Sequence, residues 1–393
     1  MSKVLPIISS YPPQDPFRKS LKKVNPTLLR VFVDLKNIQT GLYINDIVEE
    51  IVNRSETYNI VDCNMIQSLM AYCGWWKKFA KDMEIPCEIY ISSDVGDSWY
   101  HKGINKKYKA RRLQAQVLMP DYYDKLPEIR QKNELMGEVI FNKLPDIYYH
   151  YLKFLESDFM HYWLISRGLE KVEGAVNIIC SNDKDMYQSL TLPRTVQFFK
   201  VRGKHSLVTQ HNCMQFYCKS GKKSPKAQMK TENMIKKLNK EFIVAIMALV
   251  GDLSDDVPGI KGLGNMAALQ LMTDEDFIEE YIGTPDELND RVSNDESFFK
   301  KLDITDKYGK KCKEALENHQ VVTDAYKMIS FEMLSRWLES GNHTEKLKRT
   351  NYINDILSKK EIKPISDHAV FFETLQKQIP DFSLSENHVK NLF

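Results

Sequence analysis

The sequence lacks a long apolar run, and it has almost no excess of charge of either sign. Its longest uninterrupted apolar stretch is residues 242–250, against about 20 residues for a membrane-spanning helix. The N-terminus does not have the apolar core of a signal peptide. The net charge is only +2, from 55 basic and 53 acidic side chains, so affinity for nucleic acid would have to come from local patches. We therefore expect a soluble, cytoplasmic, globular protein.

Cysteine is also scarce and irregularly placed. The seven cysteines follow no regular spacing, which excludes a disulfide framework and is typical of reduced thiols inside a cell. His211, Cys213 and Cys218 lie close together, but no second cysteine pair follows at zinc-finger spacing. A metal knuckle at this point is therefore the less favoured interpretation. With 393 residues, the chain is long enough for two or three domains.

What the sequence does contain is acid at the ends of short apolar strands. Three strands are predicted: residues 28–33 before Asp34, residues 88–91 shortly before Asp94, and residues 176–180 before Asp183 and Asp185. Strands that alternate with helices predict an α/β fold with a parallel, doubly wound sheet. Ligands bind beyond the carboxyl ends of such strands. One aspartate there is usually a helix cap, but three in the same place indicate a site.

The segments between the strands have helical patterns. Residues 62–81 form an amphipathic helix, in which the Trp75–Trp76 pair could stack on bases, although packing in the core is favoured. Residues 146–167 are also predicted to be one helix, and they contain Glu156 and Asp158. These two acids would point about 200° apart on an ideal helix, so spacing alone does not bring both to one site. A pair of short strands is predicted within residues 196–208.

The most distinctive stretch is residues 251–272, which follows the apolar helix 242–250. Three acids come first and three glycines follow: Asp252, Asp255, Asp256, Gly259, Gly262 and Gly264. The pattern predicts a helix, a turn, a hairpin and a second helix. Glycines let main-chain N–H groups approach a ligand closely, which suits a phosphate chain or a cation shared with one. A glycine-proline connector between packed helices is the alternative, but it leaves the acids unexplained.

Basic residues gather in two places. Residues 102–112 contain six basic side chains and no acid, and they follow the second acidic strand end. We interpret them as a positive lid beside a negative pocket, although a solvated basic face is the common alternative. Residues 213–240 are predicted to be irregular and basic, with eight lysines and one acid between 219 and 240. This pattern predicts either a disordered insertion or a loop that faces DNA without sequence preference.

The candidate ligands form one set of acids: Asp34, Asp94, Glu156, Asp158, Asp183, Asp185, Asp252 and Asp255. Carboxylates gathered at one pocket repel one another unless cations neutralise them. Hard divalent ions such as Mg²⁺ or Mn²⁺ prefer these oxygen ligands. Two such ions about 4 Å apart can activate a water and stabilise the leaving oxygen of a phosphodiester. The acids outnumber the positive charges of two ions, so several would act through waters.

The acids and their neighbours, in this order, resemble the 5′-nuclease (flap endonuclease) superfamily. The likeness is strongest to bacteriophage 5′→3′ exonucleases, including phage ribonuclease H, and to the 5′-nuclease domain of bacterial DNA polymerase I. The motifs lie within residues 29–272: Val33-Asp34 with Asn37, Ser93-Asp94 followed by Tyr108-Lys109 and Arg112, Glu156-Ser157-Asp158, Ser181-Asn182-Asp183-Lys184-Asp185, and Gly251-Asp252-Leu253-Ser254-Asp255 running into Pro258–Gly264. Many relatives carry another acid directly after Asp158, whereas this chain has Phe159.

The resemblance implies a PIN-like, mainly parallel sheet flanked by helices, a helical arch at about 103–145 and a helix-hairpin-helix region. It also implies which residues bind metal. One ion would be held by Asp34, Asp94, Glu156 and Asp158, and the other by Asp158, Asp183, Asp185, Asp252 and Asp255. Lys109 and Arg112 would contact the scissile phosphate and act in catalysis together with Asp94 and Asp183. Further DNA contacts would come from Tyr108, Arg111, Gly259, Lys261, Gly262 and Gly264, with a K⁺ ion at the hairpin.

The expected divisions are a tail (1–27), an α/β nuclease core (28–212), a basic insertion (213–240), a helix-hairpin-helix DNA-binding region (241–345) and a C-terminal helical region (346–393). We expect a metal-dependent 5′→3′ nuclease that removes 5′ flaps or RNA primers from branched or nicked duplexes during replication or repair. In a phage, it would act in the host cytoplasm. The alternatives are a branched-DNA-binding module that cuts poorly because of Phe159, and a single-stranded-RNA nuclease.

The C-terminal tip Asn391-Leu392-Phe393 is an apolar segment behind a helical pattern. It is a candidate anchor for a sliding clamp, and a single-strand-binding protein is a second candidate partner. The alternative is that the tip packs on its own domain.

Overall fold

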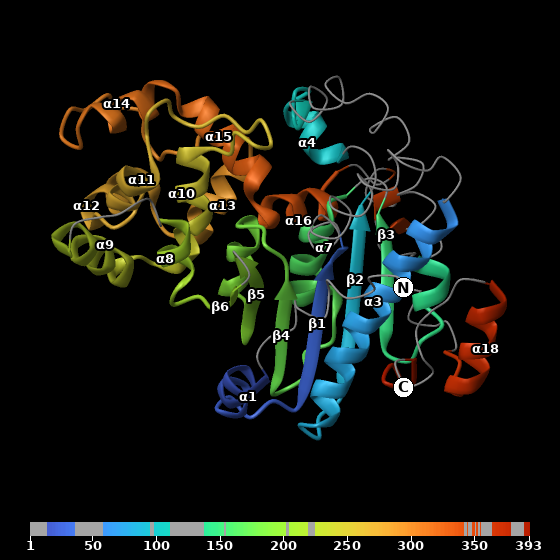
Figure 1. Ribbon diagram of the computed structural model, residues 1–393. Coiled ribbons are helices and arrows are strands. Elements are labelled where there is room, and N and C mark those ends of the chain that lie inside the picture. Colours follow the sequence, from blue (N-terminus) through green and yellow to red (C-terminus); the bar gives the residue numbers. More distant parts are fainter. Residues whose placement is uncertain are drawn as a thin grey trace.

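A six-stranded sheet forms the centre of the molecule (Figure 1). The computed structural model describes residues 14–35, 58–94, 98–110, 137–152, 155–201, 204–218, 225–341, 364–378 and 389–393, with a few single positions between 344 and 354. The strands lie in the order β3-β2-β1-β4-β5-β6. Their bounds are β1 (Leu28–Asp34), β2 (Cys87–Asp94), β3 (Ile147–Leu152), β4 (Ala175–Cys180), β5 (Thr195–Val201) and β6 (Lys204–Val208).

The strands β1 to β5 pair in parallel, and β6 runs antiparallel to β5. All seven residues of β1 are buried, as is typical of a parallel strand covered on both faces. In the register of the sheet, Asp34 lies opposite Ser92 of β2, and Val33 lies opposite Cys180 of β4. The carboxyl ends of these three strands therefore lie at one edge, as the sequence predicted. The predicted α/β class is confirmed.

The two faces of the sheet are covered by different helices. Val31 and Val33 pack with Trp76 and Phe79 of α3 on one face. Phe32 points to the other face, which α7 and the helical region cover. Trp76 is fully buried, and the ring of Trp75 stacks on Phe79 with centroids 5.3 Å apart. The tryptophan pair is thus part of the core, which confirms the favoured interpretation.

The helices of the core and the C-terminal end are α1 (Gln14–Lys22), α3 (Tyr58–Lys81), α4 (Trp99–Ile104), α7 (Ser157–Trp163), the π-helical turn η2 (Leu164–Gly168), the 3-10 helix η3 (Asp185–Thr191) and α18 (His368–Gln378). The helical region contains α8 (Cys213–Tyr217), α9 (Pro225–Lys237), η4 (Lys240–Phe242), α10 (Ile243–Val250), α11 (Asn265–Leu271), α12 (Glu275–Phe277), η5 (Ile278–Ile282), α13 (Pro285–Ser293), α14 (Lys310–Glu317), α15 (His319–Ile329) and α16 (Phe331–Glu339).

The prediction of one helix over residues 146–167 was wrong. The first part of this segment is β3, which pairs in parallel with β2, and α7 begins only at Ser157. Tyr149 and Tyr151 pack on the α3 face, while Tyr148 stacks on Tyr90 on the opposite face. Tyr148, Tyr151, Leu155 and Tyr162 follow a helical period, but residues 147–152 pair with the open edge of β2, and this pairing decides the outcome.

The prediction that residues 213–240 are irregular was also wrong. Most of this segment is helical, in α8 and α9. Thr231 and Ile235 lie four residues apart on one face of α9 and are buried, as is Leu238 directly after the helix. Of the lysines in this segment, Lys230, Lys236 and Lys237 occupy exposed positions of the helix. Residues 219–224 lie outside the described part of the chain.

The C-terminal tip packs on the α3 face of the core. Val389 and Leu392 are fully buried, and the ring of Phe393 lies 5.8 Å from that of Phe371 on α18. The tip thus contacts its own domain. Six cysteines of the described part are buried free thiols, in agreement with the expected reduced state. Among the described helices, none has the length and apolar character needed to cross a membrane.

Candidate active site at the carboxyl edge of the sheet

Asp34, the last residue of β1, joins three segments at the sheet edge. Ser181, which follows β4, donates a hydrogen bond to Asp34 Oδ2 at 2.9 Å. Ser157, the first residue of α7, donates to Asp34 Oδ1 at 3.4 Å. Asp34 is buried, so these hydroxyls compensate part of its lost hydration. Asp94 lies buried at the end of the neighbouring strand β2.

Glu156 and Asp158 stand on either side of the start of α7. Glu156 precedes the helix in an extended conformation, with φ −84° and ψ 147°, and Asp158 is in the first helical turn. The angular separation expected on a continuous helix therefore does not apply. Both acids lie near the N-terminus of α7, where the helix dipole favours negative charge.

The loop after β4 holds Asp183 and Asp185 through a chain of hydrogen bonds. The Asp183 N–H donates to Ser181 Oγ at 3.1 Å, and the Asp185 N–H donates to Asp183 Oδ1 at 3.0 Å. The buried Gln197 side chain donates to the carbonyl oxygens of Ser181 and Asp183 at 2.8 and 2.7 Å. Sequence reasoning missed Gln197, because its partners follow a neighbouring strand and no local pattern marks it.

Asp252 and Asp255 lie in a tight loop between α10 and α11. Asp252 pairs with Val257 through reciprocal main-chain hydrogen bonds, and its Oδ1 accepts bonds from Ser254. The loop returns so closely that a Cβ on Gly259 would lie 2.0 Å from the Val250 carbonyl oxygen. At least part of the glycine pattern therefore serves close backbone packing within the loop.

Lys109 reaches the acids from the segment after α4. Its ammonium forms an ion pair with Glu156 and lies 3.5 Å from Asp255 Oδ2. Its backbone has φ +58°, in the left-handed region, and its N–H donates to the Asp255 carbonyl oxygen at 3.1 Å. The Tyr108 hydroxyl donates to Glu156 at 3.0 Å. The Tyr108-Lys109 pair therefore contacts acids from two other segments.

The pKa values show that the carboxylates form one electrostatic cluster. Burial and the neighbouring carboxylates, Glu156 first among them, raise the pKa of Asp158 well above its ordinary value. Burial, together with Asp183 and then Asp158, does the same to the pKa of Asp185. The carboxylates that interact in this way are Asp34, Glu156, Asp158, Asp183, Asp185, Asp252 and Asp255.

Glu156 is the exception within this cluster. Burial by itself would raise its pKa, but the Lys109 ammonium, with smaller help from His101 and Tyr108, lowers the pKa to about 2. Glu156 is therefore ionised at neutral pH. Asp158, Asp183 and Asp185 have raised pKa values and resist ionisation. Among the residues that the structure describes, the cluster holds more acidic side chains than Lys109 can balance.

The donor set fits a hard divalent cation in its chemistry. It consists of carboxylate oxygens, which Mg²⁺ and Mn²⁺ prefer, and its excess of negative charge would be relieved by such ions. In the part of the chain that the structure describes, no three His, Cys, Asp or Glu side chains already converge as a metal site. Lys109 instead lies between Glu156 and Asp255.

Some predicted residues are exposed or lie outside the described part of the chain. Arg111, Arg112 and Asn37 are among the residues that the structure does not describe, as is most of the predicted arch, 111–136. Lys261, Gly262 and Gly264 are exposed in the loop before α11, where the hairpin was predicted, and Gly259 is half-buried. Cys213 and Cys218 are buried free thiols, and no metal-binding group forms there among the described residues.

Comparison with known proteins agrees with this geometry. No family model matches the chain. DNA polymerase I of Bacillus subtilis (strain 168) is 25% identical over 206 residues, which are 52% of this chain but only 20% of the polymerase. The structure of T5 5′-exonuclease with bound divalent metal ions (zinc) superposes with a TM-score of 0.52 at 15% identity, covering 84% of this chain and 99% of that one. The resemblance to the 5′-nucleases is confirmed.

A second solved structure extends the comparison to a nucleic-acid complex. Bacteriophage T5 flap endonuclease, in a pseudo-enzyme-product complex with DNA and metal ions, superposes with a TM-score of 0.51 at 14% identity. This superposition also covers 84% of this chain and 99% of the T5 protein. The 5′-nuclease fold therefore extends beyond residues 29–272, in which the sequence motifs lie.

Proposed function

We propose that this protein is a divalent-metal-dependent 5′→3′ nuclease that removes 5′ flaps or RNA primers from branched or nicked duplexes. One observation carries the proposal: acids from β1, α7, the loop after β4 and the α10–α11 loop form a single electrostatic cluster that Lys109 enters. The similarity to T5 5′-exonuclease and to part of DNA polymerase I supports it.

In this proposal, Asp34, Asp94, Glu156 and Asp158 would hold one Mg²⁺ or Mn²⁺, and Asp158 with Asp183, Asp185, Asp252 and Asp255 would hold the other. When bound, such ions supply a water of lowered pKa and polarise the scissile phosphate. Ser157 and Ser181 keep the Asp34 carboxylate oriented. In-line hydrolysis leaves a 5′ phosphate and a 3′ hydroxyl.

Lys109 has a second role in this mechanism. Its ammonium pairs with Glu156 and Asp255. Once released from Glu156, it would face the phosphate and offset the charge that develops there. Tyr108 keeps its hydrogen bond to Glu156 and holds this segment against the site. Arg111 and Arg112 would add positive charge along the same path.

The substrate would lie along the hairpin. Gly259, Gly262 and Gly264, with Lys261, would contact the duplex backbone, with a K⁺ ion at this point. Lys311 approaches the same loop, donating to the Lys261 carbonyl oxygen at 2.9 Å. A sliding clamp or a single-strand-binding protein would be a further partner. Clamp binding through the C-terminal tip would require Leu392 to leave its buried position.

A labelled 5′-flap duplex tests the proposal against its alternatives. With Mg²⁺, we expect short 5′ products that EDTA abolishes. A gel shift without products would instead support the binding module. Phe159 favours that second candidate: its fully buried side chain supplies no ligand where many relatives have an acid. Cutting confined to single-stranded RNA would support the third interpretation and contradict the proposal.

A further inference from the structure

The junction between α15 and α16 contacts three separate segments of the candidate site. We call residues 328–332 the elbow. It lies in residues 273–393, in which the sequence shows no catalytic or metal-binding motif. Figure 1 shows α16 next to α7 and the sheet, with α15 leading back to the helical region.

The first contact is to the loop that carries Asp183 and Asp185. Gln188 on η3 is buried, and its amide donates to the carbonyl oxygens of Asp185 and Ile329, both at 3.0 Å. Its side-chain oxygen accepts a bond from the Phe331 N–H at 2.8 Å. One amide therefore joins the aspartate loop to both sides of the elbow.

The second contact is to the segment that carries Lys109. The buried ring of His101 lies between Ser98 Oγ at 2.7 Å and the Met328 carbonyl oxygen at 2.8 Å, so its Nε2–H must donate to the carbonyl. The same ring stacks on Tyr108, with centroids 4.5 Å apart. The elbow thus supports the tyrosine that reaches Glu156.

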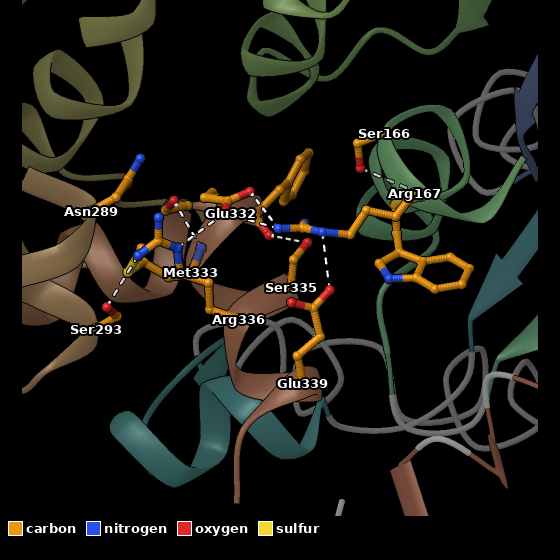
Figure 2. Close-up of polar contacts among 12 residues, drawn as sticks. Ser166, Arg167, Asn289, Ser293, Glu332, Met333, Ser335, Arg336 and Glu339 are labelled. Atoms are coloured by element: carbon orange, nitrogen blue, oxygen red, sulfur yellow. Dashed lines mark hydrogen bonds and ion pairs between the residues drawn. The ribbon is translucent and has the colours of Figure 1, made fainter. Parts of the chain in front are cut away.

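The third contact is to α7, which begins beside Glu156. The ring of Phe331 packs on Phe159 and Tyr162 at centroid distances of 6.1 and 5.6 Å. Figure 2 shows Glu332 between Arg167 and Arg336, which lie 2.9 and 3.0 Å from its Oε1. Phe159, which stands where many relatives have an acid, therefore packs against the elbow.

We propose that the elbow is a positioning element that sets the spacing of the acids and of Lys109, with Gln188 and His101 as its positioning residues. This inference rests on the proposed nuclease function. The elbow ends α15, and α15 packs against α10, which ends two residues before Asp252. A shift of the helical region would therefore move the acids of the loop after β4, of α7 and of the α10–α11 loop together with Lys109.

The test compares two buried hydrogen-bonding residues of similar depth. Gln188→Met removes the amide at the elbow. Thr323→Val removes the hydroxyl that accepts from the Phe298 N–H in the middle of α15, and serves as the control. For Gln188→Met, we expect single-turnover cleavage of saturating 5′-flap DNA to fall by about tenfold or more. Mn²⁺ affinity, measured by calorimetry without DNA, should fall similarly, with DNA affinity in Ca²⁺ unchanged. Thr323→Val should leave all three unchanged.

The outcomes separate this inference from the proposed function. A wild-type protein that cuts no flap duplex would overturn the proposed function itself. A wild-type protein that cuts, together with a Gln188→Met variant that matches Thr323→Val in rate and Mn²⁺ affinity, would overturn the elbow alone. If Gln188→Met does not fold, His101→Gln keeps a donor near Met328 but removes the ring beneath Tyr108. A slower rate at unchanged melting temperature would support the elbow, and an unchanged rate would overturn it.

Discussion

Lys109 is the residue at which the opposing charges of the site meet. Its ammonium contacts Glu156, lies near Asp255 and stands over the Tyr108 ring at 4.9 Å from the centroid. Its left-handed backbone is unusual for a lysine and directs the segment toward the acids. Six other described non-glycine residues also have a positive φ, so a functional role for Lys109 rests on its contacts with Glu156 and Asp255.

Replacing Lys109 by Ala should slow cleavage much more than it weakens DNA binding. Its charge matters most where negative charge develops in the transition state, so we expect a loss of roughly 10²–10³ in single-turnover rate. DNA affinity, measured by fluorescence anisotropy in Ca²⁺, should change little. Lys261→Ala on the exposed hairpin is the control, with the larger effect on affinity. Equal losses of rate and affinity in Lys109→Ala would identify Lys109 as a mere backbone contact.

Asp185 should make the metal-free protein less stable as pH rises. Burial and neighbouring acids raise its pKa in the folded state, so the native protein binds more protons than the unfolded chain. Between the ordinary pKa of an aspartate and this raised value, each increase in pH therefore lowers the free energy of unfolding. Asp158 acts in the same direction. Glu156, whose pKa is lowered to about 2, stabilises the folded protein at neutral pH. This contribution to the free energy of unfolding is lost only as the pH falls below the ordinary pKa of a glutamate.

Asp185→Asn should therefore raise the melting temperature in EDTA at pH 7 by at least about 1 °C, which is roughly 1 kcal/mol for a protein of this size. Its melting temperature should also depend less on pH, while cleavage in Mg²⁺ is lost. Differential scanning fluorimetry from pH 5.5 to 8 measures both effects. Asp306→Asn, at an exposed site, is the control. A lower melting temperature for Asp185→Asn would contradict the like-charge account.

At the scale of elements, the sequence correctly predicted the helices and strands whose hydrophobic pattern fits only one type of secondary structure. The apolar run 242–250 and the amphipathic stretch 62–81 are helices, as their composition requires. Residues 147–152 could not be assigned in the same way, because their aromatic spacing fits a helix as well as a strand. The free edge of β2 decides the matter, and a local pattern does not contain that information.

The helix α9 is ordered although it is rich in lysine. Lys230, Lys236 and Lys237 are exposed on it, so neutralising them should leave the fold intact. If they face DNA, Lys→Gln at all three should reduce the slope of log affinity against log salt by roughly one for each phosphate that a lysine no longer neutralises. Salt titrations at low and high KCl measure the slope. The control replaces the exposed Lys19, Lys22 and Lys23, at or just beyond the C-terminal end of α1. An unchanged slope would exclude α9 from the DNA interface.

At the scale of the whole molecule, the sequence predicted that acids gather at one edge of the sheet. It did not predict the residues that support them there. Strands that end in aspartate predict a shared edge, and Asp34 and Asp183 lie there. Gln188 and His101 could not be found from the sequence, since their partners are Ile329 and Met328, far along the chain. A single buried amide or imidazole has no recognisable sequence pattern, so its role is seen only from its contacts in the folded structure.

The order in which the site is assembled has a consequence for synthesis on the ribosome. The sheet is complete at Val208, but the loop that supplies Asp252 and Asp255 comes later, and the elbow comes later still. An unfinished chain can therefore form every strand while it still lacks two acids, along with the junction that fastens the others. Under the proposed function, a nascent chain would therefore lack a complete site until the helical region had folded onto the sheet.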